Sequence, residues 1–251
     1  MSTPTATAQK SRARRIVGHP LMHLLAAVIV LALLQTFVVK LFAVPSGSME
    51  QTLEVGDRIL VNRLADDPQP GDVVVFRTDE ALWPSHSAPQ QEGLWGAAKH
   101  AAKWFFGDIL GFGPTTAHTM VKRVIGVEGQ TVACCGENGG VLVDGIERVE
   151  PYIYEDLPFA TGSLDCESTP ISTRCFAPIQ VPEGMLLMLG DHRGASSDGV
   201  SHCRGSTDES SASGLAAGSS CARFVRVDDV YGEVLIRVWP FSAFGARETS
   251  R

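Results

Sequence analysis

The feature that most constrains this chain is an uncharged run of 24 residues near its N-terminus, from Ile16 to Val39. At about 1.5 Å per residue, a helix of this length crosses the roughly 30 Å hydrocarbon core of a bilayer. A cleaved signal peptide is the alternative, but its apolar region usually spans only about 7 to 15 residues. We therefore expect a transmembrane anchor over residues 18–40, with its apolar centre at about 21–39.

Charge is distributed unevenly on the two sides of this run. Positive residues next to a membrane span favour the cytoplasmic side. We therefore predict a basic cytoplasmic N-terminus over residues 1–17 and an extracytoplasmic catalytic domain over residues 41–251. Since no second apolar run of this length follows, we expect a single-pass protein of the cell membrane, with membrane lipids around its anchor. The charged residues before the run are all basic: Lys10, Arg12, Arg14 and Arg15.

The part of the chain after the run is acidic. Residues 41–251 contain 28 acidic and 16 basic residues. Such an excess of negative charge repels a phosphate backbone, so we do not expect nucleic acid as a partner. The chain is also 44% hydrophobic, which is typical of a folded protein and excludes a disordered one.

The chain contains six cysteines, which is consistent with an oxidising, extracytoplasmic location. Their connectivity is left open by the sequence. Cys134 and Cys135 are neighbours, and a ring between neighbours would distort their peptide bond, so we expect each to pair elsewhere. A bridge between Cys203 and Cys221 would close a Gly- and Ser-rich loop. No CxxC or HExxH motif occurs, so we expect no metal and no cofactor. The cysteines are Cys134, Cys135, Cys166, Cys175, Cys203 and Cys221.

Beyond the anchor, the hydrophobic pattern predicts a mainly β domain, an antiparallel and barrel-like sheet. The candidate strands are short, rich in β-branched residues and bounded by Gly, Pro and Asp. Asp144-Gly145 predicts the turn of a hairpin within one of them. The candidate strands are 58–62, 72–77, 120–127, 141–146, 185–189 and 232–239.

Two insertions interrupt this pattern, at about 77–118 and 199–222. Apolar residues recur at helical spacing over 95–110, which predicts a small amphipathic helix inside the first insertion. It either docks on the body or lies in the membrane interface, and the sequence does not choose between these positions.

Three segments carry the residues that suggest catalysis. The first is a tight loop directly after the anchor, with hydroxyls at Ser46 and Ser48. The second is a strand with two adjacent cations, Lys122 and Arg123. The third is the polar segment 190–198, which follows an apolar strand and contains Asp191, Arg193, Ser196 and Asp198. Taken singly, each segment is a weak signal.

Together and in this order, these segments resemble the bacterial type I signal peptidases, which are membrane-anchored serine proteases with a Ser/Lys dyad. The resemblance also includes the segment Gly71-Asp72-Val73-Val74-Val75-Phe76. It implies that Ser48 is the nucleophile, Lys122 the general base and Ser46 an oxyanion-hole hydroxyl. It further implies that Ser196 positions the lysine amine, and that three charged residues hold the loop: Asp191, Arg193 and Asp198.

The resemblance also implies the substrate. Family members remove signal peptides from exported proteins after small residues in an Ala-x-Ala pattern, and they bind the peptide as an added strand. Two alternatives remain open: a specialised peptidase for one exported substrate, and a catalytically silent, membrane-anchored binding homologue. The residues of the specificity pockets and the oligomeric state are not predicted.

The proposed base has a physical requirement. A lysine accepts a proton only when it is neutral, and its ordinary pKa of about 10.4 leaves it charged at neutral pH. Burial lowers that pKa, whereas an arginine stays protonated wherever it lies. Because strand side chains alternate, we expect Lys122 to point inward and Arg123 outward.

Other serine enzymes fit the sequence less well. A Ser-His-Asp site would need His118 or His192 as its base, but no GxSxG motif is present. One departure from the signal peptidase pattern concerns Asp198, because the Ser-Arg that commonly follows it is missing. Arg204 or Arg223 is a candidate to replace that arginine, and the alternative is that Arg193 suffices.

Overall fold

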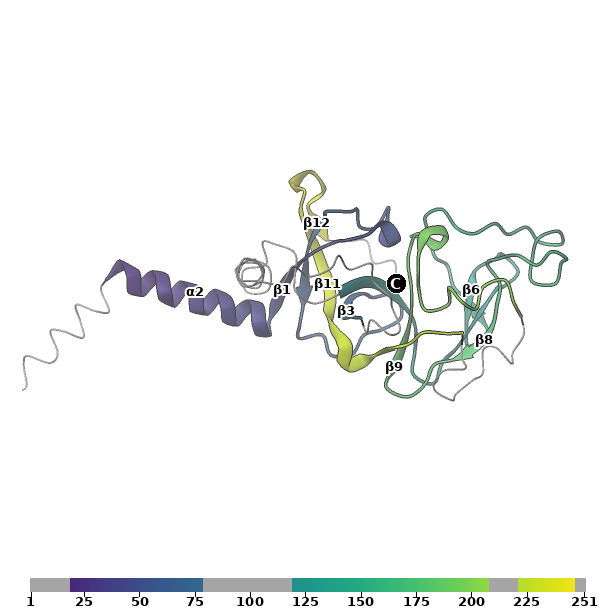
Figure 1. The fold of residues 1–251 in the computed structure, drawn as a ribbon, viewed down its shortest axis with the longest axis horizontal. Coiled ribbons are helices and arrows are strands. Elements are labelled where there is room, and N and C mark those ends of the chain that lie inside the picture. The colour runs from purple at the N-terminus through teal and green to yellow at the C-terminus, as the bar shows by residue number, and fades with distance from the viewer. Residues whose placement is uncertain (1–18, 79–118, 208–220, 247–251) are drawn as a thin grey trace, which may run out of the picture.

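The computed structural model describes residues 19–78, 119–207 and 221–246 (Figure 1). One apolar helix projects from a body of antiparallel strands that form two sheets. The mainly antiparallel β class predicted from the sequence is confirmed. The segment 95–110 lies outside the described residues, as do most of the first insertion and residues 208–220 of the second.

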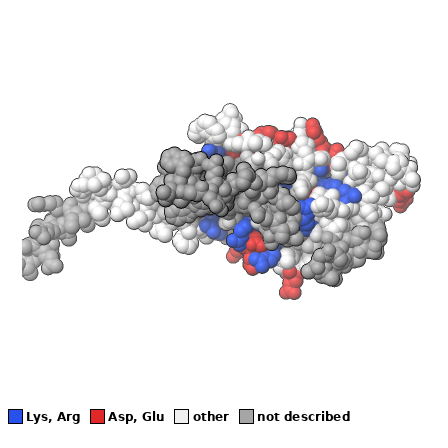
Figure 2. All heavy atoms as spheres, in the orientation of Figure 1, with Lys and Arg blue, Asp and Glu red and all other residues white. Residues whose placement is uncertain are grey.

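Helix α2 (Pro20–Phe37) occupies most of the predicted anchor. The side chain of His19 caps its first turn, since Nδ1 accepts a hydrogen bond from Leu21 N–H at 3.3 Å, and Pro20 suits the first helical position. None of its side chains is buried, and Figure 2 shows it without acidic or basic residues. Its length and mean hydropathy of 2.0 are sufficient for a membrane span.

The helix ends two residues before the end of the predicted apolar centre at Val39. Strand β1 (Val39–Ala43), which the sequence pattern did not predict, begins there and pairs with β2 (Arg58–Asn62). The backbone N–H of Arg63 donates to the carbonyl O of Val38 at 2.9 Å. The helix is therefore joined to the sheet without a linker.

The larger sheet contains eight antiparallel strands in the order β1-β2-β11-β3-β4-β9-β10, with β12 paired to β11. Strands β3 and β4 lie in its middle, and Lys122 of β4 stands opposite Val74 of β3. Apolar clusters cover both faces, which explains why β3 begins with four consecutive apolar residues and not with an alternating pattern. The remaining strands are β3 (Val73–Arg77), β4 (Thr119–Val127), β9 (Met185–Leu189), β10 (Val225–Arg226), β11 (Val230–Trp239) and β12 (Gly245–Ala246).

The smaller sheet has four strands in the order β7-β6-β5-β8. The predicted hairpin turn is confirmed, because Asp144 and Gly145 adopt φ values of 53° and 78° between β6 and β7. Strand β8 contains Pro178 and was not predicted; its place at the sheet edge tolerates the missing N–H donor. The strands are β5 (Thr131–Cys134), β6 (Val141–Val143), β7 (Ile146–Glu147) and β8 (Phe176–Gln180).

All six cysteines form disulfides. The expectation that Cys134 and Cys135 pair elsewhere was wrong, because the two neighbours are bonded to each other. The peptide bond between them is cis, and it brings their Cα atoms to 2.9 Å, so the small ring can close. The bridge considered between Cys203 and Cys221 is present, and a third bridge joins the remaining two cysteines, Cys166 and Cys175.

Candidate active site

Ser48 lies in a short 3-10 turn, η1 (Gly47–Met49), five residues after β1 ends. The turn is held by its apolar neighbours. Met49 and Leu53 are each only 1% exposed and belong to the cluster that covers one face of the larger sheet. Ser48 is itself 7% exposed, so its hydroxyl has a fixed and largely dry environment.

Lys122 reaches Ser48 from the middle of β4. Its Nζ donates a hydrogen bond to Ser48 Oγ, although 74 residues separate the two in the chain. The lysine is 2% exposed. The two side chains singled out as nucleophile and base are therefore in direct contact inside the protein.

Burial changes the acidity of this lysine. Loss of solvent lowers the pKa of Lys122 from 10.5 to about 8, against the opposing attraction of Asp198 and Asp191. At neutral pH a pKa near 8 leaves roughly a tenth of the amines neutral, compared with less than a thousandth for an ordinary lysine. The chemistry required of a lysine base is therefore accessible here.

Ser46 lies beside the pair. Its Oγ is 3.4 Å from Ser48 Oγ, and its extended backbone leads into η1. A second hydroxyl at this distance can donate to an oxygen that develops negative charge next to the nucleophile. The structure thus brings Ser46, Ser48 and Lys122 together.

The expectation that Arg123 points outward was wrong. Arg123 is 1% exposed and forms two hydrogen bonds with the carboxylate of Asp191, from Nε at 2.8 Å and from Nη2 at 2.6 Å. Its Nη1 donates to the carbonyl O of Gly71 at 2.7 Å, and its guanidinium lies 3.6 Å from the ring centre of Tyr152. Alternation along the strand still separates the two cations, but packing covers both faces of the sheet.

The Arg123–Asp191 pair is connected to the turn that carries Ser48. Thr52 donates from Oγ1 to Asp191 Oδ2 at 2.6 Å, and the next residue, His192, donates its backbone N–H to the carbonyl O of Ser48 at 3.1 Å. The predicted loop residue Asp191 therefore holds the Ser48 turn against β4.

Arg193 is also buried, with a partner that the sequence pattern did not reveal. Its guanidinium contacts Glu150 at 2.5 Å, and the phenol of Tyr152 donates to the same carboxylate at 2.8 Å. Burial, together with the charge of Glu150, raises the pKa of Tyr152, so the phenol remains a donor. Glu150 and Tyr152 come from a segment without regular periodicity, and Thr52 is a common loop residue, so no sequence signal identified them.

Asp198 and Ser196 complete the segment. Asp198 is fully buried and pairs with Arg204 at 3.0 Å, so Arg204 supplies the arginine that the sequence lacks at the usual position. Ser196 is buried, and its Oγ has no hydrogen-bond partner among the described residues. A side chain at Gly190 would overlap Ser196 Oγ and lie 2.5 Å from the carbonyl O of Ser48, which places Ser196 next to the Ser48 turn.

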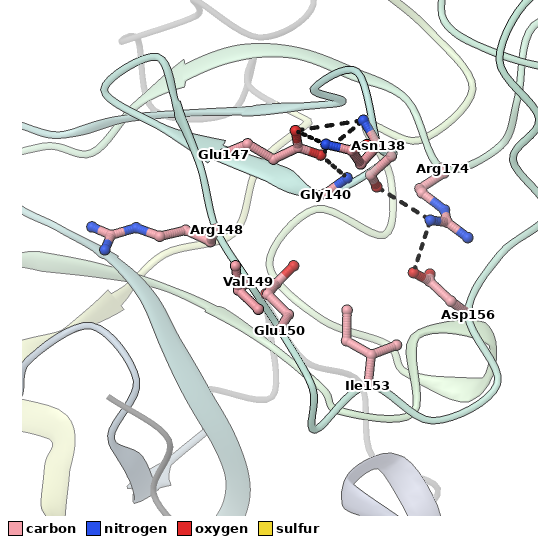
Figure 3. Close-up of a pocket in the computed structure, with 10 residues that line it drawn as sticks. Asn138, Gly140, Glu147, Arg148, Val149, Glu150, Ile153, Asp156 and Arg174 are labelled. Atoms are coloured by element: carbon pink, nitrogen blue, oxygen red, sulfur yellow. Dashed lines mark hydrogen bonds and ion pairs between the residues drawn. The ribbon is translucent and has the colours of Figure 1, made fainter.

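Two other features lie outside the set of predicted site residues, although Glu150 borders the first of them. A cavity of about 600 Å³ beside the smaller sheet is bordered by Asn138, Glu147 and Arg174, and none of the predicted site residues lines it (Figure 3). Among the described residues, Cys135, Cys166 and Cys175 bring their sulfurs close enough to share an ion. All three are in disulfides and so offer no thiolate ligand.

Such a site, a buried serine in contact with a buried lysine and flanked by a second hydroxyl, is typical of serine hydrolases that use an amine base. Comparison with known proteins identifies the family. Residues 18–239 match the sequence model described as "Signal peptidase, peptidase S26", so the chain belongs to that family.

Individual proteins named as signal peptidases are also similar in sequence to this chain. The chain is 35% identical over 219 residues to the "Probable signal peptidase I" of Mycobacterium leprae, covering 84% of this chain and 72% of that protein. It is 34% identical over 229 residues to the "Signal peptidase I" of Mycobacterium tuberculosis strain CDC 1551 / Oshkosh, covering 87% and 71%. The chain is accordingly a serine endopeptidase of the signal peptidase I type, acting on proteins that carry signal peptides.

A solved signal peptidase I from Enterococcus faecalis was also matched. The two share 17% sequence identity with a TM-score of 0.31, over 67% of this chain and 97% of that chain. A TM-score this low does not by itself establish a common fold, so the architecture rests on the strands described above.

Proposed function

We propose that the chain is a membrane-anchored signal peptidase in which Ser48 is the nucleophile and Lys122 is the general base. The observation that carries this proposal is the hydrogen bond from Lys122 Nζ to Ser48 Oγ between two buried side chains. The lowered pKa of Lys122 supports the role, because a neutral amine can take the serine proton.

The reaction then proceeds in two stages. Neutral Lys122 removes the proton from Ser48 Oγ as this oxygen attacks the carbonyl carbon of the scissile peptide bond. The lysine returns the proton to the leaving amine, and an acyl-enzyme remains on Ser48. The same amine next activates water, which attacks the ester and releases the new C-terminus.

The remaining site residues support this chemistry. Ser46 Oγ, with the backbone N–H of Ser48, stabilises the oxyanion that forms in each stage. Ser196, whose buried Oγ has no hydrogen-bond partner among the described residues, is available to position the amine of Lys122. Three charged residues keep the loop in place through the ion pairs described above: Asp191, Arg193 and Asp198.

The position of the site relative to the anchor suits a membrane-borne substrate. Helix α2 spans the bilayer with the N-terminus in the cytoplasm, and β1 and a short loop separate its end from Ser48. Membrane lipids surround the helix, and the acidic body stays in the extracytoplasmic space. A signal peptide held in the same bilayer presents its cleavage region near this depth, as an extended strand with small residues at the cut.

A panel of synthetic signal peptides tests the function and its specificity. We expect the purified full chain, in detergent, to cut peptides with Ala at both the first and third positions before the cut. Replacing either Ala with a bulky residue such as Phe should lower kcat/KM at least about tenfold, because small pockets exclude larger side chains. Equal cutting of the Ala and Phe peptides would contradict the proposed specificity, and no cutting of any peptide would contradict the activity.

Ser46→Ala tests the oxyanion role. We expect it to lower kcat about 100- to 1000-fold with little change in KM, because the lost donor acts mainly in the transition state. Ser197→Ala is the matched control, since Ser197 is exposed in the 190–198 segment and its substitution should leave kcat unchanged. A Ser46→Ala enzyme with the kcat of the control would remove Ser46 from the mechanism.

A further inference from the structure

Four of the six cysteines meet at one place beside the smaller sheet, outside the candidate active site. The Sγ atoms of Cys135, Cys166 and Cys175 lie within 4.8 Å of one another, although they belong to two different disulfides. Cys166 Sγ is also 3.4 Å from the carbonyl O of Cys134. The Cys134–Cys135 and Cys166–Cys175 bridges are therefore direct neighbours.

Stabilisation of the fold by cross-linking explains the Cys134–Cys135 bridge poorly. A disulfide stabilises a fold mainly by closing a loop in the unfolded chain, and the effect grows with loop length. The third bridge, Cys203–Cys221, joins residues 18 apart, whereas Cys134 and Cys135 are adjacent. A bond between neighbours restricts the unfolded chain least, so a chemical role accounts for it better than a structural one.

The four cysteines of these two bridges differ in solvent exposure. Cys135 and Cys166 are partly exposed, while Cys134 and Cys175 are 4% and 0% exposed. Each bridge thus has one outer and one buried member. An external thiolate reaches an outer sulfur, and its attack leaves the electron pair on the buried partner.

We propose that these two bridges form one thiol–disulfide exchange centre, in which an external thiol enters at Cys166 and the released Cys175 thiolate attacks Cys135. The ligand class is a small-molecule or protein thiol. The product is a cross-linked form in which residues 134 and 135 are bonded to residues 166 and 175.

Each step conserves electrons. The external thiolate bonds to Cys166 Sγ, the Cys166–Cys175 bond breaks, and its electron pair leaves on Cys175. That thiolate bonds to Cys135 Sγ, and the pair from the Cys134–Cys135 bond leaves on Cys134. Cys134 then attacks Cys166 Sγ and expels the external thiolate. Two disulfides precede the reaction and two follow it, so the thiol is a catalyst and nothing is oxidised or reduced overall.

The positions of the arginines allow tryptic peptide mapping to detect this exchange. Cleavage after arginine places Cys134 and Cys135 in peptide 124–148, Cys166 in 149–174 and Cys175 in 175–193. The purified full chain is incubated with reduced glutathione, quenched with N-ethylmaleimide, digested with trypsin without reduction and mapped by mass spectrometry. We expect species that join peptide 124–148 to the other two, at least about tenfold above the untreated protein.

The third bridge is the internal control, since it links peptides 194–204 and 205–223 and its sulfurs are not part of the group that lies within 4.8 Å of one another. We expect it to stay unchanged. In Cys134→Ser/Cys135→Ser, glutathione should instead accumulate on Cys166, because the acceptor is gone. The proposal is overturned if the wild-type chain shows no cross-linked 124–148 species, whether or not glutathione is attached, or if the control bridge rearranges equally.

Discussion

Ser48→Ala and Lys122→Met should each lower kcat for signal-peptide cleavage by about 10⁴-fold or more. In the proposed mechanism the serine supplies the covalent bond, and Lys122 is the only amine hydrogen-bonded to its hydroxyl among the described side chains, so losing either removes the same step. For the same reason the double variant should be no slower than either single one. The measurement is single-turnover cleavage of an Ala-x-Ala peptide by the full chain in detergent.

A matched stability measurement separates loss of chemistry from loss of fold. The pKa of Lys122 falls from 10.5 to about 8 on folding. Below pH 8 the buried cation therefore lowers the free energy of unfolding by about 3 kcal/mol. This part of the stability is regained as pH rises from 8 to 10.5, because the unfolded chain then binds more protons. At pH 7 the free energy of unfolding of Lys122→Met should therefore exceed that of the wild type by about 1 to 3 kcal/mol, and its unfolding temperature should be higher. Lys122→Met that is folded and fully active would exclude the lysine as base.

Arg123→Met should be the most destabilising of the substitutions considered. It removes the positive partner of Asp191, whose side chain is 1% exposed, and a buried carboxylate that loses its counter-charge typically costs about 3 to 5 kcal/mol. Asp191 also accepts a hydrogen bond from Thr52, and the next residue, His192, donates to the Ser48 carbonyl O. Activity should therefore fall as well. Thermal unfolding of the full chain in detergent gives the stability change.

Arg77 provides the control for that experiment. It pairs with Asp229 on the surface, with the arginine side chain 58% exposed, so Arg77→Met should leave the unfolding midpoint nearly unchanged. Adding Asp191→Leu to Arg123→Met should recover part of the lost stability, since no unpaired charge remains. Equal effects of Arg77→Met and Arg123→Met would contradict the structural role given to the buried pair.

Much of this architecture could be predicted because its determinants are local. An uncharged apolar run predicts helix α2, β-branched runs predict the central strands, and Asp144-Gly145 predicts its hairpin turn. The proposed dyad was identifiable from the order of its motifs. The contact between Ser48 and Lys122 follows from strand pairing, which brings distant segments together and which the motifs imply only jointly.

The features that were missed depend on three-dimensional context. Strand periodicity separates Lys122 from Arg123, but it does not reveal that both faces of β4 are covered or that Asp191 neutralises the second cation. The ion-pair partner Glu150 lies in an irregular segment whose position depends on tertiary packing, and the sequence did not choose between Arg204 and Arg223 as the partner of Asp198. The bond between Cys134 and Cys135 occurs together with a cis peptide bond, and no residue pattern in this segment signals either.

The central claim is that Ser48 is activated by a lysine that is neutral within the working pH range. The pH dependence of kcat/KM for an Ala-x-Ala peptide tests it most directly, measured from pH 6 to 10.5 in the range where the full chain stays folded. We predict a rise of about tenfold per pH unit below an apparent pKa near 8 and a plateau above it. A flat profile, or one that still rises steeply above pH 10 as for an ordinary lysine, would contradict the account.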